Sequence, residues 1–289
     1  MKSPIRIASA ILAAALLINL STSQSTAPRT LALTRDGPQT KTSGTGPARD
    51  AAGSASSLRP GGASIDDPLT GRRSRLPKDW VGLRVVPADT PILVMAGHAD
   101  SQQISGAGTR GAAVALKGAA PMQPGITDEL YWNMAVAKAV VELGQKRCLR
   151  IRYYEPKQRT IINGDAPGTN WSVGRAHAAA GGYAMEIHFD AYGSDGIGSG
   201  LIPAVNRPFS RLDESLASTF GAYPKGFRDV LGGPKRGIAL LEIGKLEGTL
   251  EASLRDPTRR QVTVQAIAER VVGALQKGLE PPAKPCSVQ

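Results

Sequence analysis

Strand-forming runs that alternate with helical patterns constrain the fold of this chain more than any other feature of its sequence. Two of the runs, PILVMA and GIALLEI, are almost entirely apolar, which is typical of strands buried inside a domain. The four predicted strands cover residues 91–96, 148–154, 183–189 and 237–243. Strands that alternate with helices predict an α/β fold, in which helices flank a mostly parallel sheet on both faces.

Helix signals fill the intervals between these runs. Thr127 or Asp128 is a suitable N-cap for a helix that reaches about Leu143. The Gly- and Ala-rich stretch 97–126 is expected to be a long surface loop. Asp256 is the expected N-cap of the last helix, with proline at the first helical position. The other predicted helices cover residues 172–180, 211–220 and 257–278.

The N-terminus has the layout of a secretory signal peptide. Lys2 and Arg6 precede an uncharged apolar stretch from Ile7 to Leu20, and small residues follow it. This stretch of about 14 residues is shorter than the roughly 20 that a bilayer-spanning helix needs. We therefore expect residues 1–23 to be a signal peptide, with export to the periplasm or cell wall and no stable membrane span. Retention as an uncleaved anchor is the less favoured interpretation.

Composition separates a loose N-terminal part from a globular part. Residues 24–80 are rich in Ser, Thr, Gly, Pro and Arg and show no apolar periodicity, which predicts a disordered linker. The globular domain is expected at residues 88–280, with a C-terminal tail at 281–289. The two cysteines, Cys148 and Cys286, could be joined in an oxidising compartment, and they share no metal-ligand spacing.

The chain is basic, with a formal net charge of +11, and more than half of this charge lies in the first 80 residues. A basic stripe with interleaved aromatic residues would indicate nucleic-acid binding, and none is present. We therefore expect no nucleic-acid partner. An anionic wall polymer or membrane surface, or simple solubility, accounts for the charge equally well.

Side chains that can carry chemistry occur near the carboxyl ends of the predicted strands, where open α/β sheets form their sites. His98 follows the first strand, His188 lies in the third and Glu242 lies in the fourth. A hydrolytic zinc site needs about three N or O ligands and a separate carboxylate base. A histidine taken alone is more often structural than a ligand, and the third histidine, His177, is expected to be solvated on a helix.

Four segments taken in order make residues 90–280 resemble the zinc-dependent N-acetylmuramoyl-L-alanine amidases. That family has a phosphorylase/hydrolase-like α/β fold and shows a strand ending in Gly-His, a Glu-x3-Asn-x3-Ala helix, a Ser-x-His-x-Asn-Ala strand and a Val-Glu-x-Gly strand. The matching segments here are ILVMAGH (92–98), ELYWNMAVA (129–137), EIHFDA (186–191) and LLEIG (240–244). Each motif is weak alone, and the ordered set of four is more specific.

The resemblance implies a cofactor, a substrate and residue roles. Zn²⁺ is the implied cofactor, with His98, Glu129 and His188 as metal ligands and Glu242 as the catalytic base. The implied partner is peptidoglycan, and the implied reaction is hydrolysis of the amide bond between N-acetylmuramic acid and L-alanine. Without the resemblance, Glu129 would be interpreted as a first-turn carboxylate that the helix dipole favours.

Several positions depart from the family's pattern. Ala99-Asp100 stands where the family usually has Gly-Gly, Glu186 replaces Ser, and Asp190 replaces Asn. Asp190 and Asn133 are candidates for supporting a metal ligand or contacting the substrate. These departures put in doubt which wall fragment is bound.

Two alternative functions stay open at this stage. One is an exported metallopeptidase or amidohydrolase with another substrate. The other is a non-catalytic peptidoglycan-binding domain. A binding domain would not need all four polar residues of the predicted site, and all four are present.

Overall fold

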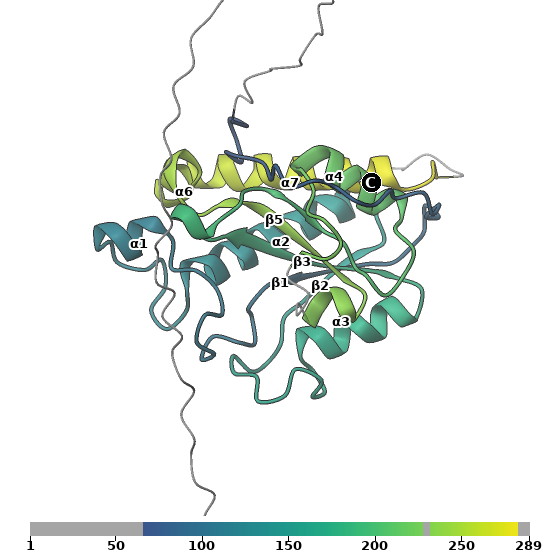
Figure 1. Cartoon of the computed structure of the whole chain (residues 1–289), viewed down its shortest axis with the longest axis horizontal. Helices are drawn as coiled ribbons and strands as arrows, with labels where there is room; N and C mark the ends of the chain where they lie inside the picture. The colour runs from purple at the N-terminus through teal and green to yellow at the C-terminus, as the bar shows by residue number, and fades with distance from the viewer. Residues whose placement is uncertain (1–65, 228–231, 283–289) are drawn as a thin grey trace, which may run out of the picture. The chain divides into compact units, whose positions relative to one another are not determined.

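The computed structural model describes residues 66–227 and 232–282, which form an α/β domain built around one five-stranded sheet (Figure 1). The strands lie in the order β2-β1-β3-β5-β4. Neighbouring strands run parallel except β4, which pairs antiparallel with β5. The strands are β1 (Ile92–Ala96), β2 (Ile151–Tyr154), β3 (Tyr183–Asp190), β4 (Gly200–Ile202) and β5 (Ile238–Lys245). The predicted mostly parallel sheet is confirmed.

Helices cover both faces of this sheet, as predicted. One face packs against α2, α4 and α7, and the opposite face packs against α3 and α5. Figure 1 shows α7 and α3 on opposite sides of the sheet. The helices are α1 (Ala112–Lys117), α2 (Asp128–Lys146), α3 (Asn170–Ala179), α4 (Arg211–Phe220), α5 (Gly232–Lys235), α6 (Gly248–Arg255) and α7 (Arg260–Gly278). Within the described residues, no helix combines the length and apolar character that crossing a membrane requires.

Alternation along β3 divides its side chains between the two layers. Ile187 and Phe189 point into the larger core, which also contains residues of α2, α4 and α7. Glu186 and His188 point to the other face, because successive strand residues face opposite sides. All eight residues of β3 are buried. A buried strand that carries Glu, His and Asp on one face is costly to fold unless these groups have partners.

Helix α2 begins as predicted, with Thr127 as its N-cap; the Thr127 hydroxyl accepts a hydrogen bond from Leu130 N–H at 3.3 Å. The predicted end near Leu143 is too early. Gly144 lies inside the helix, where a Cβ would come within 2.9 Å of the Ile151 side chain. The absence of a side chain therefore lets α2 pack closely on β2 and continue to Lys146, three residues beyond Leu143.

The last helix begins later than predicted. Asp256 is the C-cap of α6, and its carboxylate accepts a hydrogen bond from Thr258 N–H at 2.8 Å within a turn. Helix α7 follows only from Arg260. The long loop expected at 97–126 contains the short helix α1, which the alanine-rich sequence did not distinguish from loop.

The predicted linker is wrong over the part that the structure describes, because residues 66–80 pack against the domain. The Asp67 carboxylate forms an ion pair with Arg270 of α7 at 2.7 Å. Trp80 is only 5% exposed, and its Nε1–H donates to the Tyr223 carbonyl at 2.8 Å. The residues that hold this segment lie far away in the sequence. Its polar composition does not reveal these contacts, and for this reason it suggested disorder. The predicted signal peptide, residues 24–65 and Cys286 lie outside the described residues.

Candidate metal centre

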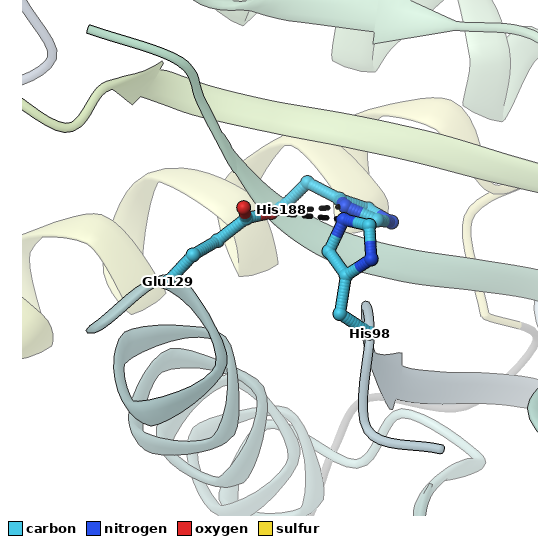
Figure 2. A group of neighbouring side chains, drawn as sticks. All are labelled: His98, Glu129 and His188. Carbon is cyan, nitrogen blue, oxygen red and sulfur yellow. Dashed lines mark hydrogen bonds and ion pairs between the residues drawn. The ribbon is translucent and has the colours of Figure 1, made fainter. Parts of the chain in front are cut away.

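Three predicted ligands from three separate elements converge at one end of the sheet. His98 lies in the turn after β1, Glu129 lies in the first turn of α2, and His188 lies near the carboxyl end of β3 (Figure 2). Their candidate ligand atoms all lie within 4.8 Å of one another. A separation of this size allows one metal ion to contact all three residues.

The geometry of the cluster selects particular atoms. Glu129 Oε1 lies 3.4 Å from His98 Nε2 and 3.3 Å from His188 Nδ1. The two imidazole rings are nearly perpendicular, at 88°, with centroids 4.8 Å apart. Two imidazole nitrogens and one carboxylate oxygen form a donor set that suits zinc, and a three-residue set leaves a coordination position for water or substrate. The residues present therefore fit the implied zinc ion.

The backbone at the end of β1 is shaped to bring the histidines together. His98 has a φ of 61°, in the left-handed region that few non-glycine residues adopt. Gly97 lies directly beneath the His188 ring, where a Cβ would come within 2.2 Å of Cε1. Glycine at position 97 is therefore required for His188 to approach this strand so closely.

Glu129 is held by groups on both sides. Its Oε2 accepts a hydrogen bond from Thr109 N–H at 2.7 Å. Asn133, one turn further along α2, is fully buried; its Nδ2 donates to the Gly97 carbonyl at 3.0 Å and lies 3.5 Å from Glu129 Oε1. Asn133 thereby connects α2 to the turn that carries His98.

Electrostatics within the cluster favour a negatively charged Glu129. Burial raises the pKa of this carboxyl, but the charge of His98 and the hydrogen bonds of both histidines outweigh it, so the pKa is lowered. Burial likewise lowers the pKa of His188, but hydrogen bonds to Glu129 and Glu186 outweigh it and raise the pKa well above its usual value. The protein therefore provides a strongly anionic surrounding for a positive charge at this point.

Glu242 lies beside the cluster on the neighbouring strand β5, paired in register with His188. It is 9% exposed and lines a cavity of about 400 Å³ together with His98, Glu129 and His188. It does not belong to the group of residues whose atoms surround the candidate metal position. A carboxylate that is close to a metal site but outside its ligand set is the arrangement that a general base requires.

Asp190 lies on the same face of β3 but holds a loop in place. Its Oδ2 accepts hydrogen bonds from Ile197 N–H at 2.5 Å and Gly198 N–H at 2.8 Å. Tyr223 Oη lies 3.4 Å from the same oxygen. Asp190 and Glu242 line the same cavity. The hydrogen bonds of Asp190 therefore hold the loop at residues 197–198 next to that cavity.

Two further residues differ from their sequence-based interpretation. His177 is half-buried rather than solvated, and its Nε2 lies 3.0 Å from the Pro91 carbonyl, outside the cluster. Burial lowers the pKa of this histidine. Glu186 was noted only as a departure from the family's pattern, yet its Oε2 lies 3.2 Å from His188 Nε2. The signal that could have found it is the two-residue spacing, which places both side chains on one face of a strand.

Solved structures similar to this chain were found at low sequence identity. The catalytic domain of an endolysin that targets Clostridia difficile is 16% identical, with a TM-score of 0.42, over 66% of this chain and 99% of that one. An N-acetylmuramoyl-L-alanine amidase of Nostoc punctiforme is 14% identical, with a TM-score of 0.41, over 66% and 97% of the two chains. The catalytic domain of an N-acetylmuramoyl-L-alanine amidase from Bacillus (Paenibacillus) polymyxa var. colistinus is 16% identical, with a TM-score of 0.41, over 65% of this chain and 95% of that one.

The chain resembles amidase catalytic domains. No protein-family model matches it, and no curated protein matches it. The roles of individual residues therefore rest on their positions in this molecule and on the four sequence motifs, not on these likenesses.

Proposed function

We propose that this protein is a zinc-dependent hydrolase that cleaves the amide bond between N-acetylmuramic acid and L-alanine in peptidoglycan. The observation that carries the proposal is the convergence of His98, Glu129 and His188, with candidate ligand atoms within 4.8 Å of one another. A further carboxylate, Glu242, lies on the adjacent strand and faces the same cavity. Together they provide a metal site and a separate base, which amide hydrolysis by a metal-assisted route requires.

His98, Glu129 and His188 would hold the zinc ion. Zinc bound there supplies Lewis-acid chemistry, because it lowers the pKa of water towards 7 and polarises a carbonyl group. Glu129 contributes the anionic ligand, and its orientation is fixed by Thr109 N–H and Asn133. A fixed ligand geometry matters because small displacements of catalytic groups cost rate.

Glu242 is the proposed general base. It takes a proton from the attacking water as the water adds to the amide carbonyl carbon. It then delivers that proton to the departing alanine amine as the carbon–nitrogen bond breaks. Glu242 ends the cycle ionised again, so one carboxylate serves both steps. Its 9% exposure keeps it accessible from the cavity while shielding it from bulk solvent.

The space around the cluster is suited to a substrate larger than a single group. The cavity of about 400 Å³ on the Glu242 side also contains Arg110 and Tyr192. A second cavity, of about 440 Å³, is also lined by His98 and His188, together with Trp171 and Glu186. Two cavities therefore reach the histidines of the candidate metal centre, which leaves room for a substrate that extends beyond the scissile bond. Export to the periplasm or cell wall, where peptidoglycan lies, is part of the proposal.

The alternative of a metallopeptidase or amidohydrolase with another exported substrate shares this metal site. The alternative of a non-catalytic peptidoglycan-binding domain does not need Glu242. These alternatives predict different products, so the substrate assay separates them.

Purified protein should be incubated with peptidoglycan, with and without a chelator, and the free amino termini that appear should be identified. The proposal predicts new L-alanine amino termini, lost with chelator and restored by zinc. Chelator-independent release would refute the zinc mechanism. Zinc binding without release would favour another substrate or a binding role.

A further inference from the structure

Glu186 and His188 form a buried pair on one face of β3. Glu186 is 4% exposed and His188 is 7% exposed. Glu186 Oε2 lies 3.2 Å from His188 Nε2, whereas His188 Nδ1 lies 3.3 Å from Glu129 Oε1 on the opposite side of the ring. The imidazole therefore lies between two carboxylates that contact different nitrogens.

The two carboxylates have different relations to the candidate metal position. Glu129 belongs to the cluster whose ligand atoms converge, and Glu186 does not. A histidine that binds a metal through one nitrogen commonly donates the N–H of its other nitrogen to a carboxylate. That hydrogen bond fixes which nitrogen carries the proton, fixes the orientation of the ring and strengthens the metal bond.

We propose that Glu186 is a positioning residue for the metal centre, and this inference rests on the proposed function. Glu186 accepts the Nε2–H of His188, which leaves the Nδ1 lone pair directed at the metal position beside Glu129. Glu186 lies outside the cluster of candidate ligands, although it lines the cavity of about 440 Å³ beside His188. Its effect on the reaction passes through the affinity of the protein for zinc.

The surroundings of Glu186 give it no competing role as a structural ion pair. Within residues 66–227 and 232–282, no lysine or arginine forms a salt bridge with it. Its Oε2 lies 3.7 Å from the position that a Cβ on Gly233 would occupy, and Leu240 is its register partner on β5. A carboxylate placed in such a setting costs free energy, and the hydrogen bond to His188 offsets this cost.

Among the residues that the structure describes, no carboxylate forms a hydrogen bond with Nδ1 of the other histidine, His98. His98 Nδ1 lies 3.5 Å from the Ser101 hydroxyl, and the His98 side chain is 27% exposed. His188 is thus the more buried of the two histidines, and Glu186 gives its second nitrogen a carboxylate partner. Replacing Glu186 should therefore weaken zinc binding without removing a ligand.

Zinc affinity, measured by competition with a chromogenic chelator, tests the proposal directly. Glu186→Leu removes the acceptor and keeps side-chain bulk, and we expect zinc affinity to fall by about 10- to 100-fold. Glu186→Gln keeps a carbonyl acceptor and should restore most of the affinity. Asp213→Asn is the control, because Asp213 is also a buried carboxylate but lines neither cavity and bonds to the hydroxyls of Tyr183 and Ser210, so zinc affinity should stay at the wild-type value.

Proton NMR of ¹⁵N-histidine-labelled, zinc-loaded wild-type protein gives a readout that does not depend on any variant folding. In the wild type, we expect the His188 ring to carry its proton on Nε2. As a separate comparison, the signal of that proton should move upfield in a folded Glu186→Leu variant. A wild-type ring protonated on Nδ1 would overturn the proposal. So would a folded Glu186→Leu protein with wild-type zinc affinity.

Neither measurement involves peptidoglycan, so the two proposals can fail separately. Wild-type protein that binds zinc with the expected Nε2–H but releases no L-alanine amino termini would refute the proposed function and leave the role of Glu186 standing. Wild-type protein that binds no zinc would refute both.

Discussion

His188 and Glu242 are register partners across the parallel strands β3 and β5. Paired residues of neighbouring strands point to the same side of a sheet, so both side chains face the candidate metal centre. His188 converges with the other proposed ligands, while Glu242 lies beside them. This relationship places a proposed ligand and a proposed base at one level of the sheet, and the sheet's hydrogen bonds hold the two in register.

Gly97→Ala should damage the metal centre from beneath. The added Cβ would lie 2.2 Å from His188 Cε1, so the ring or the backbone must shift. We expect a loss of about 1–3 kcal/mol in the free energy of unfolding, and at least a tenfold loss of zinc affinity, of the order seen when a ligand's support is removed. Denaturant unfolding and chelator competition measure the two effects.

Gly273→Ala is the matched control for that substitution. Gly273 lies within α7, and a Cβ there meets nothing within 4 Å. Alanine is favoured over glycine in a helix, so stability should rise by about 0.5–1 kcal/mol, with zinc affinity unchanged. Unchanged zinc affinity in Gly97→Ala would show that His188 does not need its present position to bind metal.

Trp80→Ala tests whether the domain begins before residue 88. Trp80 is 5% exposed and belongs to the main core, so truncation should cost about 3–5 kcal/mol of unfolding free energy. Val81→Ala changes the adjacent side chain, which is 61% exposed, and should cost less than about 0.5 kcal/mol. If both variants lost equally little unfolding free energy, this segment would belong to the linker and not to the folded domain.

Asp67→Asn should reveal a pH-dependent anchor of the same segment. Burial raises the pKa of Asp67, but hydrogen bonds from Arg270, Thr70 N–H and Leu69 N–H outweigh it, so the folded-state pKa is lowered. A lowered pKa adds stability that is complete above the unfolded value near 4 and is lost as pH falls towards the folded value. The wild type should therefore exceed the variant by about 1 kcal/mol at pH 7, and the difference should shrink below about pH 4.

Asp66→Asn supplies the control, because Asp66 is exposed and adjacent in the sequence. Urea unfolding of the three proteins between pH 2 and 7 measures the difference. An Asp67→Asn deficit that persisted unchanged at the lowest pH would argue against an ionised Asp67 as its source.

Local signals account for the elements that the sequence predicted well. Helix α4 begins and ends as expected, since Ser210 and Asp213 form a capping box and Gly221, with a φ of 107°, follows the last turn. The buried strands β1 and β5 could be predicted from their almost entirely apolar composition. By contrast, residues 66–80 are ordered through Arg270, Tyr223 and other distant partners, which composition does not encode.

The candidate site shows the same division between local and long-range information. His98, Glu129, His188 and Glu242 were predicted by position, and the structure brings the first three together with Glu242 alongside. The pairing of Glu186 with His188 depends on which way the imidazole ring turns. The bonds of Asp190 depend on how the following loop folds back. Neither follows from strand periodicity alone.

The most direct test of the account compares Glu242→Gln with His188→Ala, measuring zinc content by elemental analysis and turnover on a wall fragment that contains the muramoyl–L-alanine bond. Glu242→Gln keeps the shape of the side chain and removes the proton acceptor, so zinc should stay near one per chain while turnover falls by about 10² or more. His188→Ala removes one of about three protein ligands and should lose both zinc and turnover. Loss of zinc in Glu242→Gln would make Glu242 a ligand, and retention of both zinc and full turnover would contradict its role as the base.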